Sequence, residues 1–349
     1  YGWQKIDPAS IPGTPSFTDV FFTSADTGWI TISTTANIYR TDDGGVTFST
    51  QTTPLGSTSA IHMLDANNGY SGGQGGWVYN TPDGGQNWNM LATMGSLTDI
   101  SFPFNTDPDN PIGYACGLSG RVWKITSTLT DLNSPSASDF GGISAPSVNH
   151  VWVCGGNRIY YYNGTDFTSQ STPGGFFYDI HFINNQEGWV VGDSGVIGYT
   201  TDGGDSWNTQ TNPDPQAMSL YSVFFFDSDY GWVVGNNGLI LQTSDGGTTW
   251  TIEAEGLTTE ALRGIHFTSP TNGYVVGNGK TLIKYGELTG ISEETEVLKF
   301  DMYPNPAVSV VKLARMGLQS AVFSRQSSVL EIYDLNEKML IERHFPAGT

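Results

Sequence analysis

The stretch TTDGGDSW, from Thr200 to Trp207, decides the fold of this chain because the same pattern recurs along the sequence. Its two glycines can adopt the positive φ of a tight hairpin, and its aspartate can accept hydrogen bonds from the backbone of the turn. Three further copies read TDDGGVTF (residues 41–48), TPDGGQNW (residues 81–88) and TSDGGTTW (residues 243–250). The stretch is therefore one copy of a repeated hairpin unit.

The spacing of the hairpin aspartates gives the size of the repeat. Asp43 and Asp83 lie 40 residues apart, and Asp202 and Asp245 lie 43 residues apart. A fixed period of this size indicates one supersecondary unit per repeat. The gap between Asp83 and Asp202 is 119 residues, about three repeats, so two repeats within it have lost the hairpin motif.

A second signature counts the repeats: a small residue, then an aromatic residue, then a β-rich run. It begins at Gly28, Gly69, Gly113, Val151, Gly188, Gly231 and Gly273. Each repeat has room for four short strands separated by turn residues. A lone four-stranded sheet would bury too little and leave both edges open, whereas radial repetition protects the edges around one core. The sequence therefore predicts an all-β fold, a seven-bladed β-propeller.

The last repeat ends near Tyr285 without an outermost strand of its own. The first residues, YGWQKI (residues 1–6), are similar to the segment that follows the hairpin tryptophan in other repeats, such as residues 207–210. We expect residues 1–6 to supply the missing strand, so that the propeller spans residues 1–285.

The repeated hairpins resemble the Asp-box, or BNR, repeat. Residues 1–285 as a whole resemble the seven-bladed photosystem II assembly factor family, in which an inner strand, a Gly-Trp strand and a DGGxxW hairpin recur. The Asp-boxes are also similar to those of sialidases and of propeller xyloglucanases. These resemblances imply the fold and leave the function open, because one fold carries many functions. They also imply that Asp43, Asp83, Asp202 and Asp245 are structural.

The composition limits the classes of partner that the protein is expected to bind. The formal net charge is −20, from 14 Lys plus Arg against 34 Asp plus Glu. Binding to nucleic acid or to anionic lipid needs a basic surface, which this balance opposes. No apolar run approaches the roughly 18 residues that cross a bilayer. We therefore expect no nucleic acid partner and no membrane insertion. The chain starts at Tyr1 without a signal peptide, which is expected of a mature or trimmed form.

The C-terminal part differs in composition. Residues 286–298 are acidic and polar and are expected to form a linker, and residues 299–349 a small β-sandwich-like domain. YPNPA (residues 303–307) and VLEIYDLNEKML (residues 329–340) resemble the type A sorting domain of the Bacteroidetes type IX secretion system. The resemblance implies export by that machinery to the medium or to the outer-membrane surface of a Gram-negative bacterium, with Tyr303, Pro304, Asn305 and Pro306 in the signal. The family usually continues beyond PAG (residues 346–348) with one more strand, so we expect a partial domain.

Three acids are the candidates for catalysis. Asp19, Asp99 and Asp179 occupy one position of the innermost strands in blades one, three and five. Glycosidases need two carboxylates roughly 5 to 10 Å apart. Acids around one channel can act as acid and base or bind a cation, or they can hydrogen-bond neighbouring backbone, which is the simpler interpretation. Alternate blades are expected to keep them apart.

The other titratable groups favour structural roles. His62, His181 and His266 share one repeat position in blades two, five and seven, too far apart for metal ligands that must converge. The Asp-box aspartates lack the oxygen spacing of a calcium loop. Cys116 and Cys154 hold matching positions in neighbouring blades, beyond the Cα separation of roughly 7 Å that a disulfide allows. We expect two buried thiols, no metal and no cofactor.

The best candidate site is a face of the propeller, where the loops joining strands two and three meet the beginnings of the innermost strands. It also collects aromatic residues and cations. The residues predicted there are Trp77, Arg121, Arg158, Tyr178, Tyr221, Arg263, Lys280, Asp19, Asp99 and Asp179. Aromatic rings mixed with arginines suit a ligand with a planar or apolar face and an anionic group, such as an acidic glycan or a peptide carboxylate. The alternative is that this face is a passive surface of solvated ion pairs.

The sequence therefore predicts a secreted or cell-surface binding protein that recognises a protein or glycan, and no enzymatic activity. The alternative is a propeller glycoside hydrolase or lyase that uses the channel carboxylates. A third hypothesis is a passive stalk or adhesin module. Trp77 is expected on a loop, after the glycine-rich turn at residues 72–76.

Overall fold

The computed structural model describes residues 1–93 and 95–287, and beyond them four short strands between residues 310 and 344. The chain divides into two units, residues 1–290 and 291–349. In the second unit, β29 (Val310–Val311) pairs with β30 (Ala321–Val322), and β31 (Val329–Tyr333) pairs with β32 (Met339–His344), both antiparallel. The sorting motif at residues 303–306 and most of the acidic linker lie outside the described residues.

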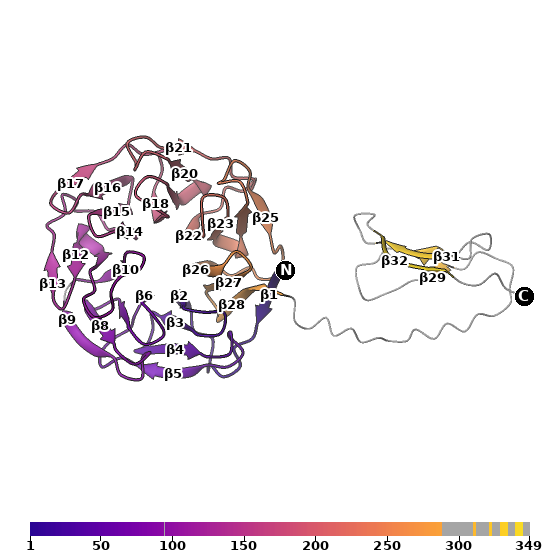
Figure 1. Cartoon of the computed structure of the whole chain (residues 1–349), viewed down its shortest axis with the longest axis horizontal. Helices are drawn as coiled ribbons and strands as arrows, with labels where there is room; N and C mark the ends of the chain where they lie inside the picture. Colours follow the sequence, from indigo (N-terminus) through magenta and orange to yellow (C-terminus); the bar gives the residue numbers. More distant parts are fainter. Residues whose placement is uncertain (94, 288–309, 312–320, 323–328, 334–338, 345–349) are drawn as a thin grey trace, which may run out of the picture. The chain divides into compact units, whose positions relative to one another are not determined.

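The first unit is the predicted seven-bladed propeller (Figure 1). Seven antiparallel four-stranded sheets surround a central channel, and the first strand of each lies innermost. From blade one to blade seven, the innermost strands are β2 (Phe17–Phe22), β6 (Ala60–Met63), β10 (Leu97–Ser101), β14 (Gly142–Ser147), β18 (Phe177–Phe182), β22 (Leu220–Phe225) and β26 (Leu262–Ser269).

The other strands follow outward in chain order. The second strands are β3 (Gly28–Ile32), β7 (Gly69–Gly72), β11 (Gly113–Gly117), β15 (His150–Gly155), β19 (Gly188–Gly192), β23 (Gly231–Gly235) and β27 (Asn272–Gly277). The third are β4 (Asn37–Thr41), β8 (Trp77–Thr81), β12 (Val122–Ile125), β16 (Arg158–Tyr162), β20 (Ile197–Thr200), β24 (Ile240–Thr243) and β28 (Thr281–Gly286). The outermost are β5 (Ser49–Thr52), β9 (Asn89–Thr93), β13 (Leu129–Asp131), β17 (Phe167–Ser169), β21 (Asn208–Thr209), β25 (Thr251–Glu253) and, in blade seven, β1 (Gly2–Ile6).

The Gly-aromatic signature has a direct packing role between blades. The Trp189 ring stacks on Phe225 of the next blade, with centroids 3.5 Å apart and planes 7° apart. Phe225 in turn covers Gly231, where a Cβ would lie 2.4 Å from the ring. The glycine therefore makes room for the phenylalanine on which the preceding blade packs. Equivalent stacks join Trp152 to Phe182, Trp232 to Phe267 and Tyr274 to Phe22.

The same aromatic residues also bind the Asp-box of the following blade. The indole Nε1 of Trp29 donates to the carbonyl of Gly84 at 3.0 Å, and that of Trp152 donates to the carbonyl of Gly203 at 3.0 Å. The Trp232 indole, which faces blade seven, has no partner among the described residues. Blade seven lacks an Asp-box, so the carbonyl that would accept this hydrogen bond is missing.

Each Asp-box is a self-contained turn. In the sixth blade, Asp245 accepts hydrogen bonds from the Thr243 hydroxyl and from the backbone N–H and hydroxyl of Thr249, at 2.7 to 2.8 Å. Hydrogen bonds of this kind stabilise the charged form, and in the fifth blade they lower the pKa of Asp202 to about 2. Gly246 and Gly247 have φ of +70° and +86°, which other residues rarely adopt. These aspartates are committed to the turns.

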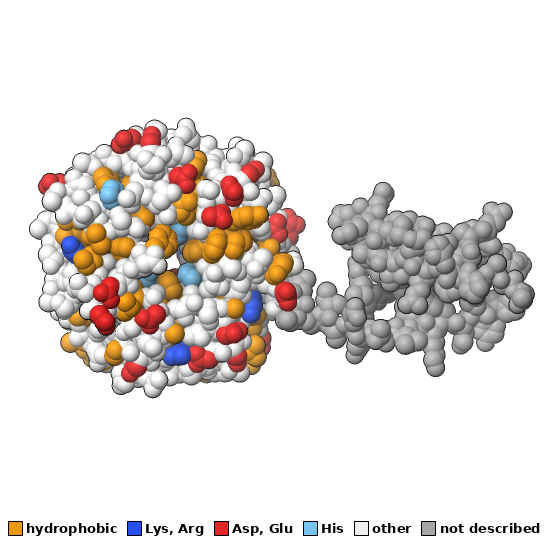
Figure 2. Space-filling model, in the orientation of Figure 1, with side chains coloured by type: hydrophobic (Ala, Val, Ile, Leu, Met, Phe, Trp, Pro, Cys, Tyr) orange, Lys and Arg blue, Asp and Glu red, His pale blue; other side chains and the backbone are white. Residues whose placement is uncertain are grey.

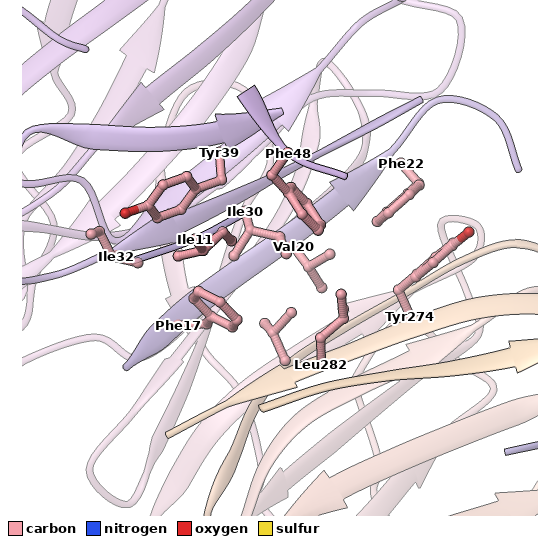
Figure 3. Close-up of a cluster of buried hydrophobic side chains, with 11 residues drawn as sticks. Ile11, Phe17, Val20, Phe22, Ile30, Ile32, Tyr39, Phe48, Tyr274 and Leu282 are labelled. Atoms are coloured by element: carbon pink, nitrogen blue, oxygen red, sulfur yellow. The ribbon is translucent and has the colours of Figure 1, made fainter. Parts of the chain in front are cut away.

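The ring closes between blades seven and one. Strand β1 pairs antiparallel with β28 over five residue pairs, from Gly2 opposite Gly286 to Ile6 opposite Leu282. Figure 3 shows the core at this junction, in which Phe22 and Val20 of β2 meet Tyr274 of β27 and Leu282 of β28. The closure therefore joins the beginning of the chain to residues more than 250 positions away.

Candidate functional site

The innermost strands line a channel whose two mouths differ in chemistry. We call the mouth at which these strands begin the start face. The opposite mouth, which carries the Asp-box hairpins and the loops joining strands one and two, is the box face. A cavity of about 470 Å³ opens at the start face, and one of about 510 Å³ extends from the middle of the channel to the box face.

Asp19, Asp99 and Asp179 form a layer inside the channel, which we call the acidic layer. In each, Oδ1 accepts the N–H of the following residue, and Oδ2 accepts an N–H of the next blade's innermost strand. The second bonds come from Ile61 to Asp19, from Ile143 to Asp99 and from Val223 to Asp179, each at 2.9 Å. The Ser222 hydroxyl adds a further bond to Asp179 at 3.0 Å. Each carboxylate therefore links two blades.

The acids are held in a poorly solvated space, where the charged form is costly. Burial raises the pKa of Asp19 to about 7 and that of Asp179 to about 6, although backbone N–H groups oppose both shifts. The pKa of Asp99 is well above its ordinary value because of burial and the charges of Asp179 and Asp19. Although alternate blades separate them, as the sequence predicts, the three carboxylates interact across the channel.

The histidines lie one layer closer to the box face and alternate with phenylalanines. His181, Phe224, His266, Phe21 and His62 form a continuous arc of rings, with neighbouring centroids 5.0, 5.2, 4.2 and 4.7 Å apart. Burial lowers the pKa of His62 and His181 to about 4 and that of His266 to about 3, so all three are neutral at pH 7. We call these five residues the aromatic arc.

The start face brings together three of the predicted ligand residues from successive blades. The rings of Tyr178 and Tyr221 have centroids 5.3 Å apart, and the Arg263 guanidinium lies 4.3 Å from the Tyr221 centroid. Arg263 is exposed, and its Nε donates to Asn278 Oδ1 at 3.4 Å. Tyr221 and Arg263 line the start-face cavity beside hydroxyl groups of blades one to three. We call the three residues the Tyr-Arg stack.

The three other predicted cations, Arg121, Arg158 and Lys280, have contacts of their own. Arg121 pairs with Asp131 of an outermost strand, and Arg158 begins the third strand of blade four. The Lys280 ammonium is 3.4 Å from Asp7 Oδ1 and 3.3 Å from the Ile11 carbonyl, so it holds the N-terminal segment in place. None of these three residues lines the start-face cavity.

The prediction that Trp77 lies on a loop is wrong. Trp77 is the first residue of β8 and is half-buried beside a core cluster that includes Trp29 and Tyr79. Its indole occupies the space that a Cβ on Gly56 or Gly75 would take. The glycine-rich turn therefore makes room for the tryptophan instead of presenting it to solvent.

Sequence reasoning missed the phenylalanines of the channel. Phe21 and Phe224 share the repeat position of the three histidines, and that shared register is the signal by which they are found. Phe104 and Phe226, in the loops after β10 and β22, line the box-face cavity and are 62% and 42% exposed. In the view of Figure 2, hydrophobic side chains surround the central opening, in which histidines are visible.

Within residues 1–93 and 95–287, no three His, Cys, Asp or Glu side chains are placed to hold a metal ion. Cys116 and Cys154 are buried and unbonded, as expected. In the described parts of the chain, no helix has the length and apolarity to cross a membrane.

Comparisons with known proteins support the fold. The family described as "Photosynthesis system II assembly factor YCF48" matches residues 166–256, which include the fifth and sixth blades. The solved structure "YCF48 bound to D1 peptide" is 19% identical with a TM-score of 0.67, and the match covers 82% of this chain and 95% of that chain. YCF48 from Cyanidioschyzon merolae is 18% identical with a TM-score of 0.66, and the coverage is 82% and 99%.

Enzymes share the same architecture. The virginiamycin B lyase of Staphylococcus aureus is 15% identical with a TM-score of 0.68, and the match covers 81% of this chain and 98% of the lyase. No curated protein matches. At these identities the structural likeness shows the fold alone. The chain is thus a seven-bladed propeller of BNR-type repeats with a YCF48-like segment at residues 166–256.

Proposed function

We propose that this propeller is a binding protein that takes an acidic segment of a partner protein at its start face. The observation that carries the proposal is the Tyr-Arg stack of Tyr178, Tyr221 and Arg263 beside the start-face cavity. The two rings offer apolar area with little conformational freedom to lose, and the guanidinium offers paired donors for a carboxylate. Such a combination is typical of residues that dominate binding energy.

The charge of Arg263 is available to a ligand. In residues 1–93 and 95–287, ion pairs within 4 Å involve Arg40, Arg121 and Lys280, and Arg263 is not among them. The chain around it has a net charge of −20. An anionic group that approaches this face is therefore attracted to Arg263, whereas the net negative charge of the chain opposes the binding of anions in general.

The start-face cavity supplies the polar contacts that an extended peptide needs. Hydroxyl and amide groups line it, from Ser16, Thr18, Ser59, Gln74, Ser96, Thr98 and Asn278. These groups can bond the backbone of a peptide or the hydroxyls of a sugar. A peptide is the first choice because a propeller of the same fold has been solved as "YCF48 bound to D1 peptide". A glycan is the second.

The alternative is a hydrolase or lyase that uses the acidic layer. Its support is the raised pKa of Asp19, Asp99 and Asp179, which provides protonated carboxyl groups near neutral pH. Against it, both oxygens of each carboxylate already accept backbone N–H groups.

The experiment that separates the two functions applies the full chain to peptide and glycan arrays and assays the glycans for released reducing sugar. Peptide binding without sugar release supports the binding protein, and release supports the enzyme.

Replacing Arg263 with alanine is expected to lower the affinity for the peptide selected on the array by about 10-fold to 100-fold, since a charge-assisted hydrogen bond contributes about 1.5 to 3 kcal/mol. The matched control is Arg121→Ala, because the Arg121 charge is paired with Asp131 away from the stack. Isothermal titration of both variants measures the effect. Equal losses in the two variants would contradict a role for the Tyr-Arg stack.

We also propose export by a type IX secretion system, on the motif at residues 303–306. In a Bacteroidetes host that has this system, the full chain fused to a secretory signal peptide is expected at the cell surface or in the medium. The same fusion without residues 299–349 is expected in the periplasm. Immunoblots of the cell fractions measure the distribution. The control is the full chain in a host without the secretion machinery, and export that survives the truncation would rule the proposal out.

A further inference from the structure

The box-face cavity is a second pocket, whose chemistry is opposite to that of the start face. It has a volume of about 510 Å³, within the roughly 300 to 1,000 Å³ of small-molecule sites. The aromatic arc forms its wall, and the acidic layer lies at its inner end. The lining includes no Lys or Arg among the described residues. An anion would therefore meet the carboxylates with no compensating charge.

The wall is built for contact with a flat ring. Neighbouring rings of the aromatic arc are tilted by 36° to 59° to one another, and the arc extends over five of the seven blades. Tilted rings expose parts of their faces and edges, and aromatic ligands prefer offset and edge-to-face contacts over direct sandwiches. In the other two blades the same position holds Ser101 and Ser144, whose hydroxyls accept backbone N–H groups of the next blade. Those two positions leave space where the arc is open.

The neutral histidines add hydrogen-bonding groups without charge. His266 Nδ1 accepts the Phe22 N–H at 3.3 Å, which places the ring hydrogen on Nε2 as a free donor. His181 Nε2 bonds the Phe225 carbonyl at 3.0 Å, which leaves Nδ1 as an acceptor. The wall thus offers one donor and one acceptor between aromatic surfaces, and an uncharged ligand can use both.

The rim extends the apolar surface to solvent. Phe104 of blade three and Phe226 of blade six stand on different sides of the mouth, 62% and 42% exposed. Exposed large apolar side chains are informative when they gather around a concave site. Both are positioned to cover the outer part of a molecule that enters the cavity.

We propose that the box-face cavity binds an uncharged aromatic small molecule, whose rings contact the aromatic arc and whose outer part contacts Phe104 and Phe226. This site is independent of the Tyr-Arg stack, because the two lie at opposite mouths of the channel. It gives the propeller two ligands of different chemistry, an acidic segment at the start face and an uncharged aromatic molecule at the box face.

The test uses two fluorescent probes that differ by one charged group. N-phenyl-1-naphthylamine is uncharged, and 8-anilino-1-naphthalenesulfonate is the same ring system with a sulfonate. At pH 8, above the raised pKa of Asp19 and Asp179, the full chain is expected to bind the uncharged probe saturably, with one site per chain. It is expected to bind that probe at least about tenfold more tightly than the sulfonate, which faces the ionised carboxylates. Replacing both Phe104 and Phe226 with serine is expected to lower the affinity for the uncharged probe roughly tenfold.

The matched control is Phe176→Ser, which removes a 60% exposed phenylalanine that precedes β18 at the start face. This variant and Arg263→Ala are expected to bind the uncharged probe as the parent chain does. Equal affinity for the two probes, or an equal loss in Phe176→Ser, would overturn the proposal. Absence of saturable binding would also overturn it and would favour a protein loop as the occupant of the cavity.

Discussion

Removal of residues 1–6 is expected to lower the free energy of unfolding by at least about 4 kcal/mol, because the deletion opens the ring. It removes the whole of β1 from β28 and exposes the edge of blade seven. It also removes Trp3, whose ring packs 5.0 Å from Tyr285 and 5.9 Å from Phe267. Trp3 is half-buried, and loss of a fully buried tryptophan costs about 3 to 5 kcal/mol, so the packing and the strand pairing both contribute to the loss. Urea denaturation followed by tryptophan fluorescence measures the change.

The control for this deletion is a chain that lacks only Tyr1, which is 67% exposed and precedes β1. That variant is expected to unfold at the urea concentration of the parent chain. The substitution Trp3→Ala is expected to fall between the two, because it keeps the backbone pairing and loses the packing. If removal of residues 1–6 leaves the transition unchanged, β1 does not close the ring in solution.

The substitution Asp19→Asn is expected to destabilise the propeller by about 2 to 4 kcal/mol at pH 5. Asp19 accepts the N–H groups of Val20 and Ile61 on its two oxygens. At pH 5 the carboxyl of Asp19 is protonated, and its hydroxyl oxygen can still accept one of these N–H groups. The NH₂ group of an asparagine cannot accept, so one backbone N–H loses its partner. A buried donor without a partner costs about 1 to 3 kcal/mol, and the amide hydrogens add a repulsive contact. Urea denaturation of both proteins gives the difference.

The cost of Asp19→Asn is expected to shrink as pH rises. The pKa of Asp19 is raised from 3.8 to about 7 in the folded protein. A group whose folded pKa is raised contributes stability that is fully present below the unfolded pKa and is lost as pH rises through the folded value. The parent chain therefore loses about 2 to 3 kcal/mol of this contribution between pH 5 and pH 8, and the asparagine variant does not.

The difference between the two proteins isolates Asp19 from the histidines. The pKa of His62 and His181 is lowered to about 4 and that of His266 to about 3, so their contribution is present above the unfolded pKa and is lost as pH falls. That opposite trend is common to parent and variant and cancels. Asp205→Asn, at an exposed Asp-box position, is the control and is expected to have little effect at either pH. A cost that is the same at pH 5 and pH 8 would contradict the raised pKa.

The repeat made most of the propeller predictable. The hydrogen bonds of an Asp-box lie within eight residues, as those of Thr243 and Thr249 to Asp245 do. The motif can therefore be recognised from the sequence without knowledge of the rest of the fold. The Gly-aromatic signature is equally regular because each copy performs the same packing task, as Trp189 does on Phe225. Trp77 misled the prediction because a glycine-rich segment is typical of a solvent-exposed turn. Here the missing Cβ atoms of Gly56 and Gly75 admit the indole.

The sequence by itself determined the number of blades, the strand order and the repeat positions of the three channel aspartates and three histidines, because these follow from local turn chemistry and a period of about 40 residues. Only the tertiary structure decided which of those positions meet. Neighbouring blades bring together residues 42 or 43 positions apart, so that the Tyr221 centroid lies 5.3 Å from that of Tyr178 and 4.3 Å from the Arg263 guanidinium. In contrast, Arg121 precedes a third strand and Arg158 begins one, farther from the channel axis. The electrostatic interaction of Asp19, Asp99 and Asp179 likewise arises from the closed ring, which confines their charges in a space with little water.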